Sequence, residues 1–198
     1  MYQFFDTETS GLFDFKAPAT AKHQPHVAQI GMVLTDENFN IKAKWDTLIE
    51  PVDAAGIPWE MDEEAQKIHG ISVEDCKAFG IPIRTAMVLM RDYRRCAQVH
   101  VAYNEKFDRG MIEAETHRLG GNSFLGGARF CPMLALTPIL KIPGPYGFKW
   151  PKLAEAYKWA TDGGVMEKAH DAMADILATV TVVKAIKERE PQLLKGLV

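Results

Sequence analysis

Several features that would assign a function class at once are missing from this chain of 198 residues. No apolar run approaches the roughly 20 residues that a membrane helix needs, and the N-terminus lacks the basic and then apolar pattern of a signal peptide. The three cysteines are scattered and form no CxxC pair, which indicates a reducing compartment and inert thiols. These absences favour a cytoplasmic protein without contact to a membrane.

A surplus of positive charge is missing as well, since the formal net charge is −3. A protein that coats nucleic acid without sequence preference is normally basic, so this charge counts against a pure binding protein. It is compatible with an enzyme whose carboxylates hold divalent cations, because the cations neutralise that part of the charge.

An ordinary globular pattern is present, with 47% hydrophobic and 25% charged residues and no repeat or linker. We expect one domain over residues 1–198. Apolar runs separated by short turns predict an antiparallel meander of strands over 1–6, 27–34 and 41–49. A further strand is expected over 98–103, and helices over 62–69, 82–95, 105–119, 151–159 and 171–188. Strands followed by alternating helices and strands predict an α/β layered domain.

Residues 122–150 contain Pro132, Pro138, Pro143 and Pro145 and are expected to be mostly loop. Trp150 lies there beside Lys149 and Lys152, and it is the one tryptophan that we single out as a candidate base-stacking platform.

Asp6 and Glu8 follow the first apolar run and are separated by one residue. Alternate side chains of a strand share a face, so both carboxylates point the same way. Two acids so placed repel each other unless a cation lies between them. Oxygen ligands suit Mg²⁺ or Mn²⁺ rather than zinc. The pair therefore predicts a metal site, although a solvated turn after a strand has the same two letters.

Asp108 falls in the first turn of the helix expected over 105–119. An acid there is stabilised by the helix dipole, and Asn104 before it is a good N-cap, so a purely structural role explains the position equally well.

His170 and Asp175 are five residues apart and cannot share one face of a helix. We therefore place His170 on the segment leading into the last helix, with Asp171 as N-cap and Asp175 one turn inside. A fixed carboxylate suits a metal ligand, whereas an imidazole that is neutral near pH 7 suits a general base.

Three segments stand in a characteristic order: Phe4-Phe5-Asp6-Thr7-Glu8-Thr9-Ser10-Gly11-Leu12, then Asn104-x-x-Phe107-Asp108, then His170-x4-Asp175. In these motifs, over nearly its whole length, the chain resembles the DEDDh (DnaQ-like) 3′–5′ exonucleases. The sequence around His170 is most similar to the catalytic domain of bacterial exonuclease I. The resemblance implies a ribonuclease H-like α/β fold, with three antiparallel strands, then parallel strands, and helices on both faces of the sheet.

The resemblance also implies an activity, the release of nucleoside 5′-monophosphates from the 3′ end of single-stranded DNA by a two-metal-ion mechanism. Two Mg²⁺ or Mn²⁺ ions would be held by four carboxylates, those of Asp6, Glu8, Asp108 and Asp175. His170 would act as the general base. The expected substrate contacts are Thr7, Gly11, Leu12, Asn104 and Phe107. For Leu12 and Phe107, packing in the core is the alternative.

Two other readings of the family resemblance stay open. The catalytic residues do not distinguish DNA from RNA, so an exoribonuclease of the ribonuclease T or oligoribonuclease type fits as well. A proofreading module that docks to a DNA polymerase is the other, and neither a polymerase nor another protein partner can be assigned. His23-x-x-His26 has a zinc-like spacing but no thiol or second pair, so we expect a polar loop there.

Overall fold

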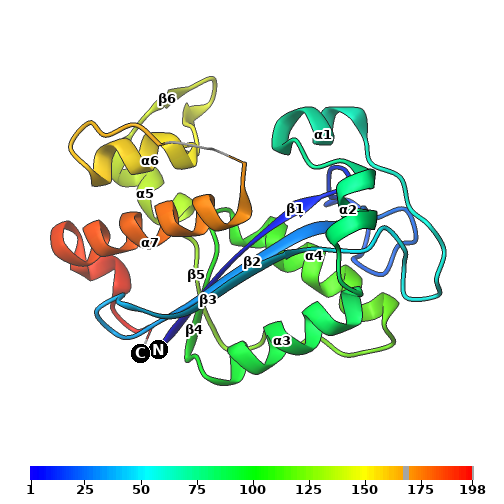
Figure 1. Ribbon diagram of the computed structural model, residues 1–198. Helices are drawn as coiled ribbons and strands as arrows, with labels where there is room; N and C mark the ends of the chain where they lie inside the picture. The colour runs from blue at the N-terminus through cyan, green and yellow to red at the C-terminus, as the bar shows by residue number, and fades with distance from the viewer. Residues whose placement is uncertain (167–169, 198) are drawn as a thin grey trace.

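A five-stranded mixed sheet in the order β3-β2-β1-β4-β5 forms the centre of the molecule (Figure 1), in a computed structural model that describes residues 1–166 and 170–197. β1 (Tyr2–Thr9), β2 (Val27–Thr35) and β3 (Ile41–Leu48) form the predicted antiparallel meander. β4 (Val99–Val101) and β5 (Ala128–Phe130) continue the sheet in parallel with β1. This arrangement confirms the predicted ribonuclease H-like fold class.

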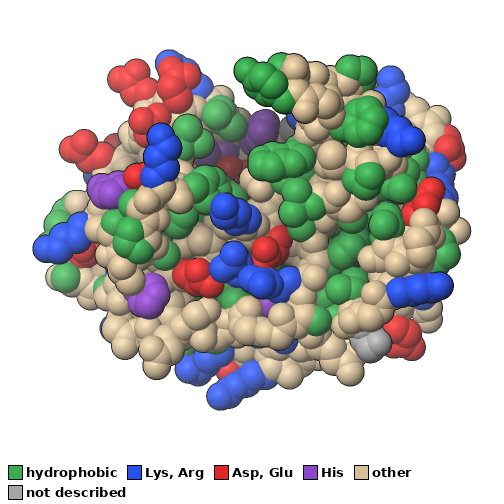
Figure 2. Space-filling view, turned by 180° about the vertical axis from the view of Figure 1, so that it is seen from behind, with side chains coloured by type: hydrophobic (Ala, Val, Ile, Leu, Met, Phe, Trp, Pro, Cys, Tyr) green, Lys and Arg blue, Asp and Glu red, His purple; other side chains and the backbone are tan. Residues whose placement is uncertain are grey.

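Two short helices, α1 (Glu63–His69) and α2 (Val73–Phe79), lie beside the end of β1 (Figure 1). α1 begins at Asp62, whose carboxylate accepts the backbone N–H groups of the first turn. α2 was not predicted, because it is only two turns long and is held by a capping box at Ser72 rather than by an apolar stripe. Figure 2, seen from behind, shows a notch in the outline of the molecule with histidine and acidic side chains inside it.

The prediction of loop over residues 122–150 was wrong for much of that stretch. It contains β5, helix α5 (Pro132–Leu140) and a small hairpin of β6 (Pro143–Gly144) and β7 (Gly147–Phe148). Pro132 opens α5, where a missing N–H costs nothing, and Pro138 falls near its end. The prolines therefore mark the ends of elements here rather than their absence.

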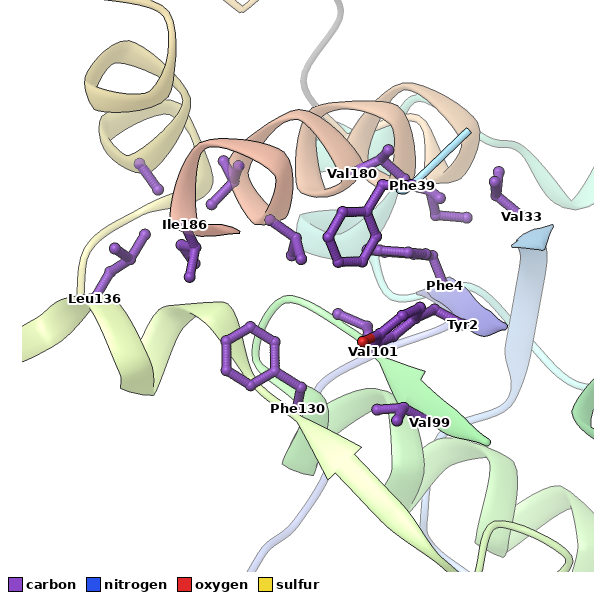
Figure 3. Close-up of a cluster of buried hydrophobic side chains, with 14 residues drawn as sticks. Tyr2, Phe4, Val33, Phe39, Val99, Val101, Phe130, Leu136, Val180 and Ile186 are labelled. Carbon is purple, nitrogen blue, oxygen red and sulfur yellow. The ribbon is translucent and has the colours of Figure 1, made fainter. Parts of the chain in front are cut away.

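Helices cover both faces of the sheet. On one face lie α5, α6 (Leu153–Ala160) and α7 (Ala172–Arg189), and on the other α3 (Ile83–Arg95) and α4 (Glu105–Arg118). β1 serves both layers, because Phe4 packs in the core under α7 (Figure 3) and Phe5 packs in the core over α3 and α4. A strand buried on both faces explains the unbroken apolar run at the N-terminus.

The chain ends in a short 3-10 helix, Pro191–Leu194. Among the described residues, none of the helices combines the length and the apolar character needed to cross a bilayer.

Candidate active site

β1 carries the first two acids of the site to the end of the central strand. Its last residues alternate in burial, since Thr7 and Thr9 are buried while Asp6 and Glu8 are partly exposed. The strand extends to Thr9, three residues beyond its predicted end, so both carboxylates lie on regular strand and on one face.

Asp108 joins this strand to α4. It is 3% exposed, and its Oδ1 accepts hydrogen bonds from the backbone N–H and the hydroxyl of Thr7, both at 2.9 Å. Asn104, before the helix, has a left-handed backbone with φ 66° and its side chain makes no capping bond. Asp108 is thus fixed against β1 by side-chain bonds rather than by the helix start alone.

The start of α7 brings the third part of the site. Asp171 is the N-cap and accepts the N–H of Ala174 at 2.9 Å, and Asp175 lies one turn inside the helix. His170 precedes the helix, is exposed and has φ 67°, and its backbone N–H donates to Asp175 Oδ1 at 3.3 Å. This is the arrangement that the five-residue spacing predicted.

β2 sets the height of α7 above the sheet. The side-chain oxygen of Gln29 accepts the N–H of Ala172 at 3.3 Å. A Cβ on Gly31 would lie 2.8 Å from Ile176 Cδ1 and 3.2 Å from Ala172 Cβ, so only glycine admits the helix this closely. This strand was predicted from the sequence, but its role in positioning Asp175 was not.

The end of β1 and the start of α7 meet in one cluster of side chains. Ligand atoms of Glu8, His170 and Asp175 all lie within 4.8 Å of one another. The predicted ligands were carboxylates alone, with His170 as a base beside them. The geometry instead puts the imidazole at ligand distance as well, so His170 can act either on a proton or on a metal ion.

Unbalanced negative charge marks this cluster. Burial, followed by repulsion from Asp108, raises the pKa of Asp6 well above its usual range. Burial raises the pKa of Glu8 to about 8, with repulsion from Asp175 second, and burial raises the pKa of Asp175 itself to about 6. Burial also raises the pKa of Asp108, although the bonds from Thr7 oppose the change.

No lysine or arginine within the described ranges forms an ion pair with these four carboxylates. Oxygen donors that repel one another and lack a protein cation fit a hard divalent cation, which would relieve the repulsion. The chemistry of this donor set therefore fits a metal centre.

A cavity of about 390 Å³ opens beside Glu8. Four of the five expected substrate contacts line it, namely Thr7, Gly11, Leu12 and Phe107, and Asn104 does not. Leu12 is 89% exposed, which rules out the core-packing alternative for it, whereas Phe107 also packs against the core below α4.

The other wall of the cavity is α1. This helix was predicted over 62–69, but its place in the site was not. Its contribution includes Ala65, Ile68 and His69. α1 buries none of its residues, so its apolar side chains face the cavity instead. The sequence contains one signal for this wall, the apolar pair Ala65 and Ile68 on a short helix. The pair indicates a cavity wall only when the position of that helix in the fold is known. The Nδ1 atom of His69 accepts the N–H of Ile71 at 3.0 Å, so this side chain also fixes the turn after α1.

His23 and His26 form no joint site. His23 lies 3.1 Å from Asp14, while His26 lies 3.1 Å from Glu115 and stacks on Trp59. The expected polar loop is confirmed.

Comparison with known proteins agrees with this geometry. Residues 4–183 match the model of the RNase_T family, described as exonuclease. No curated protein matches the chain in sequence.

Among solved structures, a zinc-bound complex of E. coli exonuclease I with single-stranded DNA superimposes with a TM-score of 0.76 at 22% identity, over 98% of this chain and 41% of that one. E. coli exonuclease I with a dA16 oligonucleotide gives 0.76 at 21% identity, over 97% of this chain and 42% of that one. The chain thus spans about two fifths of the length of these exonuclease I chains. On the family match over most of its length, the chain belongs to the RNase_T exonuclease family.

Proposed function

We propose that the chain is a metal-dependent 3′–5′ exonuclease that releases nucleoside 5′-monophosphates from single-stranded DNA. The observation that carries the proposal is the convergence of Glu8, His170 and Asp175 within 4.8 Å, next to Asp6 and beside a cavity. The similar structures of exonuclease I contain single-stranded DNA, which supports this substrate class.

Four carboxylates would hold two divalent ions, Mg²⁺ or Mn²⁺. The side chains that would hold them are those of Asp6, Glu8, Asp108 and Asp175. When bound, such ions lower the pKa of water and neutralise charge that develops on the phosphate. Oxygen donors favour hard ions, but one similar structure of exonuclease I contains zinc, so zinc belongs in the test.

His170 would accept the proton of the attacking water. It is exposed, so it can exchange that proton with solvent, and its ring lies beside the carboxylates of Glu8 and Asp175. Attack of this water on phosphorus breaks the bond between phosphorus and the 3′ oxygen of the preceding nucleotide. The terminal nucleotide then leaves with its 5′-phosphate.

The cavity would hold that nucleotide. Leu12 and Ile68 offer exposed apolar surface for its base, and Phe107 lines the same space. The Thr7 hydroxyl already donates to Asp108, so Thr7 would contact the substrate through the wall it forms rather than through a free hydroxyl.

The test is digestion of matched DNA and RNA oligonucleotides labelled at either end, in chelator and then with Mg²⁺, Mn²⁺ or Zn²⁺. We expect no cleavage in chelator, restored cleavage with Mg²⁺ or Mn²⁺, and early release of the 3′ label as a mononucleotide from DNA. Early release of the 5′ label would contradict the direction. Full activity in chelator would contradict the metal site, and faster cleavage of RNA would reassign the chain to the exoribonucleases.

A further inference from the structure

The β6–β7 hairpin presents aromatic rings to solvent. Tyr146 lies in the turn of the hairpin and is fully exposed, and Phe148 and Trp150 are 54% and 64% exposed. The N–H of Lys149 donates to the carbonyl of Ile142 at 2.9 Å, which continues the ladder past β7. Phe148 and Trp150 lie on either side of Lys149 in the chain, directly after the turn that carries Tyr146. The three rings line a hollow of about 360 Å³.

The hairpin and the residues on either side of it are also basic, in a chain that is acidic as a whole. Residues 141–152 contain three lysines and no acid, although the whole chain has a net charge of −3. Lys141 and Lys152 are exposed, at the two ends of the segment. Exposed rings flanked by the cations of Lys141 and Lys152 match a polyanion that carries flat apolar groups, which describes single-stranded nucleic acid.

The base of the hairpin is fixed. Lys149 Nζ lies 2.7 Å from Glu155 on α6, and the hydroxyl of Tyr103 donates to the carbonyl of Pro151 at 2.8 Å. The aromatic surface is therefore held on two neighbouring elements.

Tyr103 also connects the hairpin to the candidate active site. β4 pairs in parallel with β1, with Val101 opposite Phe4, so Tyr103 leaves the sheet at the level of Asp6. Figure 1 shows β6 on one side of the start of α7, and α1 with the end of β1 on the other side. If the terminal nucleotide of a single-stranded nucleic acid lies in the cavity under α1, the rest of the nucleic acid would run from the carboxylates toward the hairpin.

We propose that the β6–β7 hairpin is a second subsite, which stacks bases of a single strand upstream of the nucleotide being removed. This proposal rests on the proposed exonuclease function. Every base has a flat face, so stacking on Tyr146 and Trp150 requires no particular sequence. Paired bases are already stacked on each other, so a duplex would gain little from the same rings.

The test compares two oligothymidylates on the full chain in chelator, where no cleavage occurs: a trinucleotide that reaches only the catalytic cavity, and a strand of about 15 nucleotides that covers both subsites. For each ring removed, in Tyr146→Ala and Trp150→Ala, the Kd of the longer strand should rise roughly 5- to 100-fold while that of the trinucleotide stays constant. With metal added, the rate of trinucleotide cleavage should also stay constant.

Two controls separate stacking from general damage. Phe79→Ala removes an aromatic ring that is 73% exposed on α2 and should leave both Kd values unchanged. Trp150→Phe keeps a flat ring and should restore most of the binding. The longer strand should also quench tryptophan fluorescence in the wild type, and this quenching should shrink in Trp150→Phe.

The outcomes distinguish this proposal from the one on which it depends. A wild-type chain that cleaves neither strand refutes the exonuclease function. A wild-type chain that cleaves both, with hairpin variants that bind the longer strand as tightly as before, refutes the hairpin subsite alone. Loss of binding that is equal for both lengths also refutes it. A change in the sedimentation of the variants without any change in Kd would assign the rings to a protein interface instead.

Discussion

Asp6 is surrounded by more negative charge than any other residue of the site, because Asp108, Glu8 and Asp175 all raise its pKa. Asp6→Asn removes one charge from this group, so the variant should be more stable than the wild type in metal-free buffer. It should nevertheless lose at least about 90% of turnover, since metal stabilisation contributes several kcal/mol to the reaction. Thermal melting in chelator and a digestion rate with Mg²⁺ measure both effects. An Asp6→Asn variant as active as the wild type would exclude Asp6 as a ligand of a metal ion needed for cleavage.

His170 and Asp175 are neighbours whose roles can be separated. His170→Ala should lower kcat by roughly 10²- to 10⁴-fold, which is the usual contribution of a general base, and leave metal affinity nearly intact. Asp175→Ala should weaken metal binding as well, because it removes a fixed oxygen ligand. Isothermal titration with Mn²⁺ provides the comparison. Equal losses of metal affinity would make His170 a third ligand, as its position within 4.8 Å of both carboxylates allows.

Glu8 should give the metal-free protein a characteristic dependence on pH. Its pKa rises from an ordinary value of 4.5 to about 8 in the folded chain, so between these values the folded protein binds more protons than the unfolded one. The free energy of unfolding therefore falls as pH rises through this window, by an amount on the order of 3 kcal/mol.

Chemical denaturation in chelator at pH 5 and pH 8 measures this difference. Glu8→Gln should reduce it without abolishing it, because the raised pKa values of Asp6, Asp108 and Asp175 act in the same direction, and Mg²⁺ should reduce it by replacing the protons. Glu188→Gln, an exposed residue of α7, is the matched control and should change nothing. A metal-free protein that is more stable at pH 8 than at pH 5 would contradict the burial of Glu8.

At the scale of elements, the contact between β2 and α7 decides where Asp175 lies. In Gly31→Ala the new methyl group would lie 2.8 Å from Ile176 Cδ1 and 3.3 Å from the backbone carbon of Ala172, so the Ile176 side chain must turn and the start of α7 must give way. We expect a loss of about 1–3 kcal/mol of stability from overpacking and an activity loss of at least about tenfold, with all site residues still present. Digestion rates and denaturation curves test this.

Two variants control the glycine experiment. Gly126→Ala adds a methyl group with no neighbour within 4 Å and should be neutral. Ile176→Val removes the nearest clashing atom, so in combination with Gly31→Ala it should recover part of the activity. Independent, additive losses in the double variant would show that the helix had not been displaced by this contact.

Patterns with one physical cause were readable from the sequence. The meander followed from apolar runs and short turns, and the placement of His170 before α7 followed from helix geometry. α2 and α5 were missed, since caps and terminal prolines define them more than an apolar stripe does. The α1 wall of the cavity was missed for another reason, because exposed Ile68 gains its role only from distant neighbours.

At the scale of the whole molecule, the proposed exonuclease should distinguish a single-stranded end from a paired end. A terminal nucleotide must be unstacked to reach the carboxylates, which costs a few kcal/mol more from a paired end. We therefore expect a single-stranded 3′ end to be cleaved faster than a blunt duplex. A 3′-phosphate should block cleavage, since it adds charge beside the acids. Competition between labelled single strands and unlabelled duplex measures the preference, and faster degradation of the duplex would contradict it.

The net charge of −3 also predicts a weak hold on the substrate. Binding should weaken further as salt rises, and cleavage should be distributive, leaving ladders of intermediates. A time course against excess unlabelled competitor decides this. Complete digestion of single molecules while others remain intact would show processive action instead.

The order of the elements along the chain has a consequence for synthesis. Strand β1, with Asp6 and Glu8, is made first, and α7, with Asp175, is made after every other helix of the sheet layers. At roughly 5–20 residues per second, ribosomes need on the order of 10–30 s to make the chain between them. Until then the nascent polypeptide holds only part of the cluster, so the nuclease activity proposed above should be absent from a growing chain.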